Sequence, residues 1–368
     1  MIQKTLADFP FASKYLMART TGTLLEVARR CAVSQSTVSR VLNNSKHGRF
    51  SVSNEVRERI LRVAQELNYR PSVAARNLTV SKTHLVAVLG VRAIWSDAVG
   101  PMERAVAALA KSLDSAGYEI CLQFLSKRHN PFDLPPLRVD GVIAVGAQSL
   151  DDLQALELAQ VPYVSLNGVV GRAGSLVAPD DAHGTRLALT HLVDLGHRRI
   201  AYFDNPGADA RHPSVFDRRA AFAEARGELG FEVPEPHLKP LDPDLPWDLY
   251  YEPFIRDAVV EGKATAVLAY SHQAALGLLR TAHDMGLAVP KDFSLVCFND
   301  EPVTRLSVPS LTAVDLPSKE LGQAAAELLL GQMSSDGQPS PQRIKLDETL
   351  IARESTAAPS ATSKPRAS

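Results

Sequence analysis

The sequence has few cysteines and no long apolar run. Its 368 residues include only three cysteines, Cys31, Cys121 and Cys297, which lie far apart without any CxxC pair or Cys/His cluster. These counts argue against a disulfide framework or a zinc site, and we predict neither a metal nor a cofactor. No stretch approaches the ~18 apolar residues of a membrane span, and residues 1–20 contain no apolar run suited to a signal peptide. These absences predict a cytoplasmic protein.

Catalytic signatures are also missing. The sequence contains no GxSxG, HExxH, P-loop or dinucleotide GxGxxG motif, and its ten histidines are dispersed. We therefore predict that the protein is not an enzyme. A transport binding protein is also disfavoured, because such a protein needs an export signal.

Charge is distributed unevenly along the chain. Residues 1–82 contain 14 lysines and arginines against 5 aspartates and glutamates, whereas the remainder contains 26 against 36. A basic segment joined to an acidic bulk indicates that only the N-terminal part of the chain meets a polyanion such as nucleic acid.

Three short amphipathic helices are predicted in this basic segment. Ser34 is a suitable N-cap for a second helix that runs to residue 43, and a third helix follows Ser53. The first helix carries apolar residues at the spacing of one helix face: Leu24, Val27, Ala28 and Cys31. This arrangement is typical of a helix-turn-helix module.

The second helix carries an unusual polar face. Gln35, Ser36 and Arg40 lie opposite its apolar residues, where a surface helix usually has Glu and Lys. Such side chains can meet the hydrogen-bonding edges of bases in the major groove of DNA, and an arginine can discriminate guanine by ~1–3 kcal/mol. The alternative is a small helical bundle that binds another protein.

Two stretches of this segment resemble a known family. "TLLEVARRCAVSQSTVSRVLNN" and "VSNEVRERILRVAQELNYRPSVAARNL" are similar to the DNA-binding head of the LacI/GalR regulators. The resemblance implies a hinge helix in "PSVAARNL", whose Leu78 would wedge between base pairs; the alternative for Leu78 is a linker residue packed on the next domain. The predicted DNA-binding residues are Thr23, Ser34, Gln35, Ser36, Thr37, Ser39, Arg40, Asn43, Tyr69, Ser72, Ala75 and Leu78.

The head departs from the family pattern at two places. Ala32 occupies a turn position where the family commonly has glycine, and a left-handed alanine costs about 1 kcal/mol. The loop at residues 44–52 is also about four residues longer than usual. Its basic side chains either add phosphate contacts or lie in solvent.

From residue 84 onward, short apolar runs alternate with amphipathic helical patterns. "LVAVLGV", "YEICLQFL", "DGVIAVGA" and "PYVSLN" are predicted strands of a first lobe, and "RRIAYFD", "ATAVLAY" and "FSLVCFND" of a second. Such alternation predicts an α/β fold with parallel sheets, and a ligand site between two lobes. This part also resembles the LacI/GalR family, whose regulatory core is like a periplasmic binding protein. The resemblance implies that the chain crosses between lobes near residues 168–180, 300–317 and 340.

The resemblance also implies which residues bind a ligand. Arg218 matches the family's ligand-contacting arginine, and two tryptophans border the expected cleft; the alternatives are a solvated helix face for Arg218 and plain core for the tryptophans. Ser271 and His272 stand where relatives often have Asn-Asp, and Asn299 lacks the usual carboxylate, which puts a simple neutral sugar in doubt and leaves an anionic ligand open. The predicted ligand-binding residues are Trp95, Asn167, Arg218, Trp247, Ser271, His272 and Asn299.

These observations predict the following organisation of the chain. It comprises a disordered extension (1–20, with Met17 as a second candidate start), a helix-turn-helix domain (21–70), a hinge (71–82), a two-lobed ligand-binding and dimerisation domain (83–356) and a disordered tail (357–368). We predict a homodimeric repressor that binds a pseudo-palindromic DNA operator. A small molecule, a sugar or related metabolite, would modulate its affinity. An activator of the same kind is the alternative.

Overall fold

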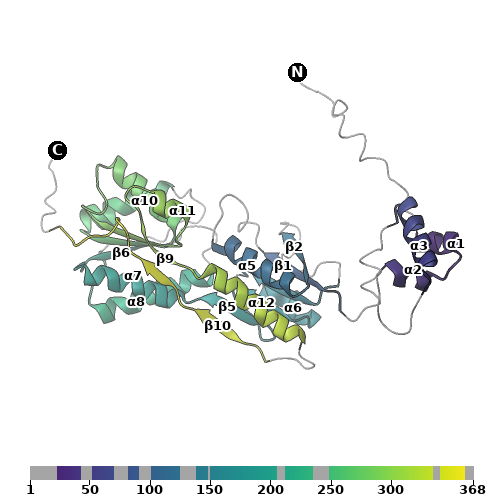
Figure 1. Cartoon of the computed structure of the whole chain (residues 1–368). Coiled ribbons are helices and arrows are strands. Elements are labelled where there is room, and N and C mark those ends of the chain that lie inside the picture. The colour runs from purple at the N-terminus through teal and green to yellow at the C-terminus, as the bar shows by residue number, and fades with distance from the viewer. Residues whose placement is uncertain are drawn as a thin grey trace, which may run out of the picture. The chain divides into compact units, whose positions relative to one another are not determined.

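Three short helices form the first unit of the structure: α1 (Leu24–Cys31), α2 (Gln35–Leu42) and α3 (Asn54–Glu66) (Figure 1). The computed structural model describes residues 23–42, 52–69, 82–90, 101–124, 138–147, 150–204, 212–234, 248–334 and 340–360. It divides the chain into two units, Met1–Lys82 and Thr83–Ser368. The helices lie where the sequence predicts them, with α2 ending at Leu42 and residue 43 outside the described part.

Local hydrogen bonds set the ends of these helices. The hydroxyl oxygens of Ser34 and Ser53 accept hydrogen bonds from the backbone N–H groups of Thr37 and Val56, at 3.1 and 3.3 Å. Both residues are therefore the N-caps that the sequence predicts. Ala32 follows α1 with φ 52° and ψ 44°, which confirms the predicted left-handed turn without glycine.

The three helices share one small core. Apolar side chains from each helix are buried together, and the core residues are Val27, Ala28, Cys31, Val38, Val41, Ile60 and Ala64. Because α2 uses Val38 and Val41 for this core, its opposite side is left for solvent or a partner. A core of this size is why the helices, each too short to be stable alone, fold as a unit.

The second unit begins with an N-terminal lobe built on a parallel sheet. Its strand order is β10-β5-β4-β3-β1-β2, and every neighbouring pair is parallel. The strands are β1 (Leu85–Gly90), β2 (Glu119–Phe124), β3 (Gly141–Val145), β4 (Tyr163–Leu166), β5 (Ser175–Pro179) and β10 (Arg343–Leu346). The sequence predicts β1 to β4 but not β5 or β10.

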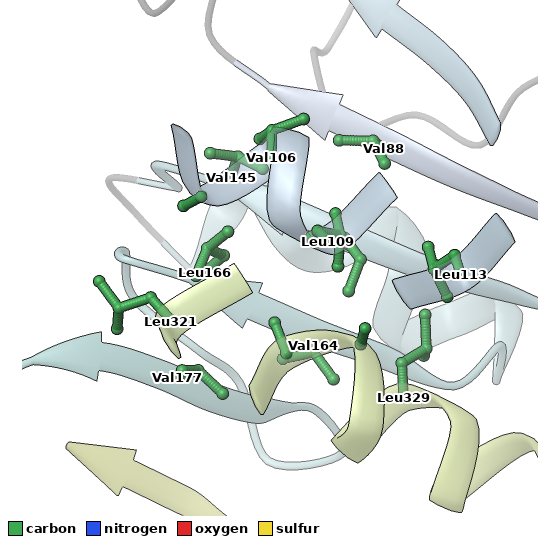
Figure 2. Packing of buried hydrophobic residues seen from close by; sticks show 14 of the residues in the cluster. Val88, Val106, Leu109, Leu113, Val145, Val164, Leu166, Val177, Leu321 and Leu329 are labelled. Carbon is green, nitrogen blue, oxygen red and sulfur yellow. The ribbon is translucent and has the colours of Figure 1, made fainter. Parts of the chain in front are cut away.

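Helices cover both faces of this sheet. On one face, α5 (Pro101–Ser115) and α12 (Ser318–Ser334) pack against each other and against the strands. Figure 2 shows the resulting core, in which Leu109 and Leu113 of α5 and Leu321 and Leu329 of α12 lie around Val164 of β4. The other face is covered by α6 (Gln154–Ala159) and the 3₁₀ turn η3 (Asp151–Leu153) before it.

The C-terminal lobe repeats this plan. Its sheet has the order β11-β9-β8-β7-β6, parallel except for the antiparallel pair of β11 and β9. The strands are β6 (Ile200–Phe203), β7 (Ala266–Ala269), β8 (Ser294–Phe298), β9 (Thr312–Asp315) and β11 (Thr349–Ile351). The helices are α7 (Asp181–Asp194), α8 (Pro213–Leu229), α9 (Asp248–Phe254), the π-helical segment η4 (Ile255–Glu261), α10 (His272–Asp284) and α11 (Pro302–Leu306).

The chain crosses between the two lobes three times. The crossings lie between β5 and α7, between β9 and α12, and between β10 and β11. The first two fall at the ends of the predicted ranges. The third lies at Asp347–Glu348 rather than near residue 340, because the intervening residues form the edge strand β10 of the N-terminal lobe.

The predicted disordered tail begins too early. Ser355 is fully buried and its backbone N–H donates to the carbonyl of Ser310. The backbone of Ala357 is also held by hydrogen bonds. Its N–H donates to Ser294 Oγ at 3.0 Å, and its carbonyl accepts from His197 Nε2 at 2.9 Å. The small residues of "STAAPS" thus fill hydrogen-bonding positions beside the sheet, and the described chain continues to residue 360.

We predict opposite effects for two glycines on α12. A Cβ on Gly322 would lie 2.0 Å from the carbonyl oxygen of Ala105 in α5, whereas a Cβ on Gly331 would meet nothing within 4 Å. Gly322→Ala should therefore lower the free energy of unfolding by about 1–3 kcal/mol, because the two helices must separate. Gly331→Ala should raise it by up to about 1 kcal/mol.

Urea denaturation monitored by circular dichroism measures both variants. Equal stabilities for Gly322→Ala and the wild type would contradict the close contact between α5 and α12.

Candidate DNA interface and interlobe site

The outward face of α2 is polar and accessible. Gln35, Ser36 and Arg40 are exposed, while Val38 and Val41 on the opposite side are buried. The small core of the head therefore fixes which side of α2 can meet a ligand. Exposed glutamine, serine and arginine side chains can donate and accept hydrogen bonds at base edges.

Several predicted contact residues already have structural roles in the head. The hydroxyl of Ser34 is hydrogen-bonded to those of Ser36 and Thr37, at 2.7 and 2.8 Å. Thr23 caps α1 by accepting from the N–H of Glu26 at 3.2 Å. The hydrogen bonds that cap the helices fix the positions of these side chains, and any phosphate contact must be made from those positions.

Other predicted contact residues are less accessible or lie elsewhere. Ser39 is half-buried. Tyr69 packs on the core of the head, and its burial raises the pKa of the phenol. Four further residues lie outside the described part of the chain: Asn43, Ser72, Ala75 and Leu78.

In the second unit, Arg218 is buried and tightly bound. Its Nε donates to Asp181 Oδ1 at 2.6 Å, and its Nη1 donates to the carbonyl of Tyr270 at 2.6 Å. The guanidinium also lies 3.7 Å from the ring centroid of Phe298. With only 4% of Arg218 exposed, the structure excludes a solvated helix face for this residue. Its charge is already matched by Asp181.

A second carboxyl group lies beside this ion pair. Glu348, at the third crossing, is 1% exposed, and both of its carboxylate oxygens lack hydrogen-bond partners among the described residues. Burial raises the pKa of Glu348 to about 9, with the nearby Asp181, Asp180 and Asp315 adding to the rise and Arg218 opposing it. Glu348 is therefore uncharged at neutral pH. It was not among the residues predicted from the sequence.

Asn167 joins the lobes through its backbone. It follows β4 with φ 51°, and its carbonyl accepts a hydrogen bond from His212 Nε2 at 2.8 Å. His212 caps α8 of the other lobe by way of Ser214, whose hydroxyl is 2.7 Å from that of Tyr270. The Asn167 side chain donates weakly to Met102 Sδ at 3.6 Å.

Ser271, His272 and Asn299 follow two neighbouring strands, β7 and β8. The hydroxyl of Ser271 caps α10 by accepting from the N–H of Ala274 at 3.2 Å. Burial and the Arg104 charge lower the pKa of His272 to about 4, so this imidazole is neutral at pH 7. Asn299 adopts φ 71° and is half-buried. Arg218 and His272 are the two side chains here that could carry a positive charge toward an anionic ligand. Arg218 is paired with Asp181, and His272 is uncharged.

Arg104 and Glu301 form an ion pair between the lobes. Arg104 lies in the first turn of α5, and its Nη1 donates to Oε2 of Glu301, which precedes α11. Glu301 is 2% exposed, and burial raises its pKa while Arg104 opposes the rise. Neither residue was predicted from the sequence, because nothing in their local sequence indicates that they meet.

Trp95 and Trp247 lie outside the described residues. Within the described ranges, no three His, Cys, Asp or Glu side chains are grouped to hold a metal ion. Among the helices that the structure describes, none is long and apolar enough to cross a membrane.

Comparison with known families decides what kind of chain this is. Residues 23–72 match the family described as bacterial regulatory proteins, lacI family, and residues 189–356 match the periplasmic binding protein-like domain. The chain belongs to the LacI family. The resemblance and the fold class predicted from the sequence are thereby confirmed.

Relatives of this LacI-family member cover nearly its whole length. The HTH-type transcriptional repressor PurR of Erwinia tasmaniensis is 29% identical over 348 residues, which are 91% of this chain and 97% of that protein. A solved structure of the lac repressor dimer bound to operator and the anti-inducer ONPF covers 92% of this chain and 99% of its own, with 26% identity and a TM-score of 0.69.

A complex of the transcriptional regulator CelR with cellobiose covers 91% of this chain and 100% of its own, with 28% identity and a TM-score of 0.62. The prediction that the protein is not an enzyme is confirmed by these relatives, which are regulators of transcription.

We predict that Glu348 makes the stability of this LacI-family member depend on pH. The folded state holds a proton on Glu348 up to about pH 9, whereas an unfolded chain releases it near pH 4.5. The free energy of unfolding should therefore fall between these values, by about 1.4 kcal/mol per pH unit from this group. Glu348→Gln keeps the shape of the side chain but has no group that titrates. It should therefore abolish the contribution of Glu348 to the slope of the free energy of unfolding against pH.

Thermal denaturation between pH 5 and pH 8 measures the slope. The control is Asp347→Asn at the neighbouring carboxyl, whose side chain is 81% exposed and which should keep the wild-type slope. An unchanged slope in Glu348→Gln would show that Glu348 is ionised in the folded protein.

Proposed function

We propose that this protein is a sequence-specific DNA-binding repressor of transcription whose operator affinity is modulated by a small molecule bound between its two lobes. The single observation that carries the proposal is the exposed polar face of α2 on a basic head, joined to a two-lobed domain. Relatives named as transcriptional repressors support it. An activator with the same architecture is the second candidate.

Base readout is assigned to the exposed face of α2. Gln35, Ser36 and Arg40 would contact base edges in the major groove, and Tyr69 would contact DNA near the hinge. Residues 71–82 would form a hinge whose Ser72, Ala75 and Leu78 contact the minor groove. Phosphate contacts are assigned to the remaining polar residues of the head: Thr23, Ser34, Thr37, Ser39 and Asn43.

The effector is assigned to residues 83–356, within the second unit. Parallel α/β lobes place ligands outside the carboxyl ends of their strands, where Asn167, Ser271, His272 and Asn299 lie. Arg218 would contribute to the site indirectly, because it holds Asp181 and the carbonyl of Tyr270 after β7 in place. Trp95 and Trp247 would border the ligand. The cellobiose complex of CelR supports an effector of the sugar class.

A homodimer is the assembly we propose, because a pseudo-palindromic operator presents two equivalent half-sites. The lac repressor relative is a dimer on its operator. An apolar surface on the C-terminal lobe supports such a contact. Leu306 and Val308 are 80% and 90% exposed, beside a groove lined in part by Leu276, Leu279 and Pro309. Exposed apolar patches of this kind mark protein contacts.

Coupling between effector and DNA follows from reciprocity. An effector that changes the angle between the lobes alters how well two hinges can be ordered on DNA. A compound that weakens operator binding must then bind less well to the operator complex. We place the protein in the cytoplasm, associated with the nucleoid when bound to DNA.

Affinity selection of sheared bacterial DNA by the purified protein at about 150 mM salt tests the proposal. At this salt concentration non-specific binding is weak, since it falls steeply with ionic strength. Recovery of a short inverted repeat is the expected result. Recovery of unselected DNA, both alone and with added metabolite extract, would contradict the proposed function.

Removal of Arg40 should relax base preference. We expect Arg40→Ala to lose about 1–3 kcal/mol of discrimination at one base pair in each half-site, because a bidentate contact to guanine is lost. Arg62→Ala, which removes an exposed arginine from α3, should leave the selected sequence unchanged. Sequencing of DNA selected by each variant is the measurement, and identical logos for Arg40→Ala and the wild type would refute the role of Arg40.

A charge at Leu306 should weaken the dimer. Leu306→Asp is expected to raise the dimer dissociation constant at least tenfold, since a carboxylate would be buried against the apolar surface. Leu158→Asp, at a 77% exposed leucine of α6, is the matched control. Sedimentation equilibrium measures both, and a Leu306→Asp dimer as tight as the wild type would place the interface elsewhere.

A further inference from the structure

Glu301 carries a buried oxygen without a partner. Its carboxylate follows β8 at the start of α11 but makes no cap to that helix. Oε2 accepts from Arg104, while Oε1 is buried without a hydrogen-bond partner among the described residues. Buried carboxylate oxygens are almost always hydrogen-bonded. No group of the described chain donates a hydrogen bond to Oε1, so a donor from elsewhere is expected.

A second unpartnered atom lies in the same region. Nδ1 of His272 is buried and has no hydrogen-bond partner among the described residues, although only 5% of the residue is exposed. Arg104 contacts Glu301 directly, and its charge also lowers the pKa of the His272 imidazole. The three residues come from the segments that follow β1, β7 and β8, at the carboxyl ends of strands from both lobes.

The charges in this cluster balance. The Arg104 cation matches the Glu301 carboxylate, and His272 is neutral because its pKa is lowered to about 4. Arg218 is not available to an anion, since Asp181 holds it at 2.6 Å. An anionic ligand would therefore meet no unmatched cation among these groups. A ligand with uncharged O–H or N–H donors would satisfy Oε1 of Glu301 without disturbing the balance.

Glu301 can also supply the carboxylate that is missing at Asn299. Asn299 provides an amide where a carboxylate is usual, but Glu301 lies two residues further along the same loop and provides a buried carboxylate. We propose that Glu301, held by Arg104 and flanked by His272, is the hydrogen-bond acceptor that selects a hydroxyl-bearing, uncharged effector. This assignment rests on the proposed function, in which the effector binds between the lobes.

Arg104 is a positioning residue in this arrangement. Its guanidinium orients the carboxylate by binding Oε2, which leaves Oε1 as the oxygen of Glu301 without a hydrogen-bond partner among the described residues. A purely structural ion pair between the lobes would behave differently. Its loss would change the melting temperature of the unliganded protein without changing the affinity for an added compound.

The test uses the full-length protein with glucose, ribose and cellobiose as uncharged probes, and glucose 6-phosphate, gluconate and glucosamine as charged ones. Melting temperatures are measured at millimolar probe concentrations, and dissociation constants of stabilising probes by calorimetry. We expect at least one uncharged probe to stabilise the wild type, and its dissociation constant to rise at least tenfold in Glu301→Gln. Arg104→Gln should also weaken binding, and Glu224→Gln, at an exposed carboxylate of α8, should not.

Three results would overturn the assignment: stabilisation by charged probes alone, no stabilisation by any uncharged probe, or equal affinity in Glu301→Gln and the wild type. Selection of DNA by Glu301→Gln, carried out in parallel, separates this inference from the proposed function. The variant should recover the same inverted repeat as the wild type. If neither recovers a repeat while the loss of sugar affinity is observed, the acceptor role stands and the repressor proposal fails.

Discussion

The buried guanidinium of Arg218 is the interaction on which the C-terminal lobe and its junction with the N-terminal lobe depend. An arginine keeps its charge in a folded protein, so a buried one requires partners on every side. Here those partners are Asp181 at the start of α7, the Tyr270 carbonyl after β7 and the ring of Phe298 at the end of β8. One side chain from α8 thereby fixes three segments that meet where the chain changes lobes.

The same junction explains the charge states around it. Arg218 neutralises one carboxylate, Asp181, and the second carboxyl group, Glu348, stays protonated because burial disfavours another negative charge. Gly184 makes room for it, since a Cβ there would lie 1.7 Å from Glu348 Oε2. Away from this junction, the lobes are joined by hydrogen bonds from Arg104 to Glu301 and from His212 to the Asn167 carbonyl. A ligand shifts the angle between lobes only if it favours one set of these contacts.

Local patterns account for the parts of the fold that sequence analysis predicted. The helices α1 to α3 follow from apolar spacing and from capping serines at 34 and 53, and the strands β1, β3, β7 and β8 are short, largely apolar runs that are almost wholly buried. The missed strand β10 alternates exposed and half-buried residues and pairs with β5, more than 160 residues earlier. Its assignment as a strand depends on a partner that no local pattern reveals.

The sequence by itself determined the division into a basic helical head and a two-lobed α/β domain, the family, and the side of α2 that faces outward. Each of these depends on patterns that can be read along the chain: the balance of charge, the spacing of apolar residues and short stretches that resemble the family. Only the tertiary structure decided that Arg218 is matched by Asp181, that His272 is neutral and that Glu301 meets Arg104, 197 residues away. The physical reason is that charge states and hydrogen-bond partners depend on burial and on neighbours from other elements, which are set when the two lobes pack.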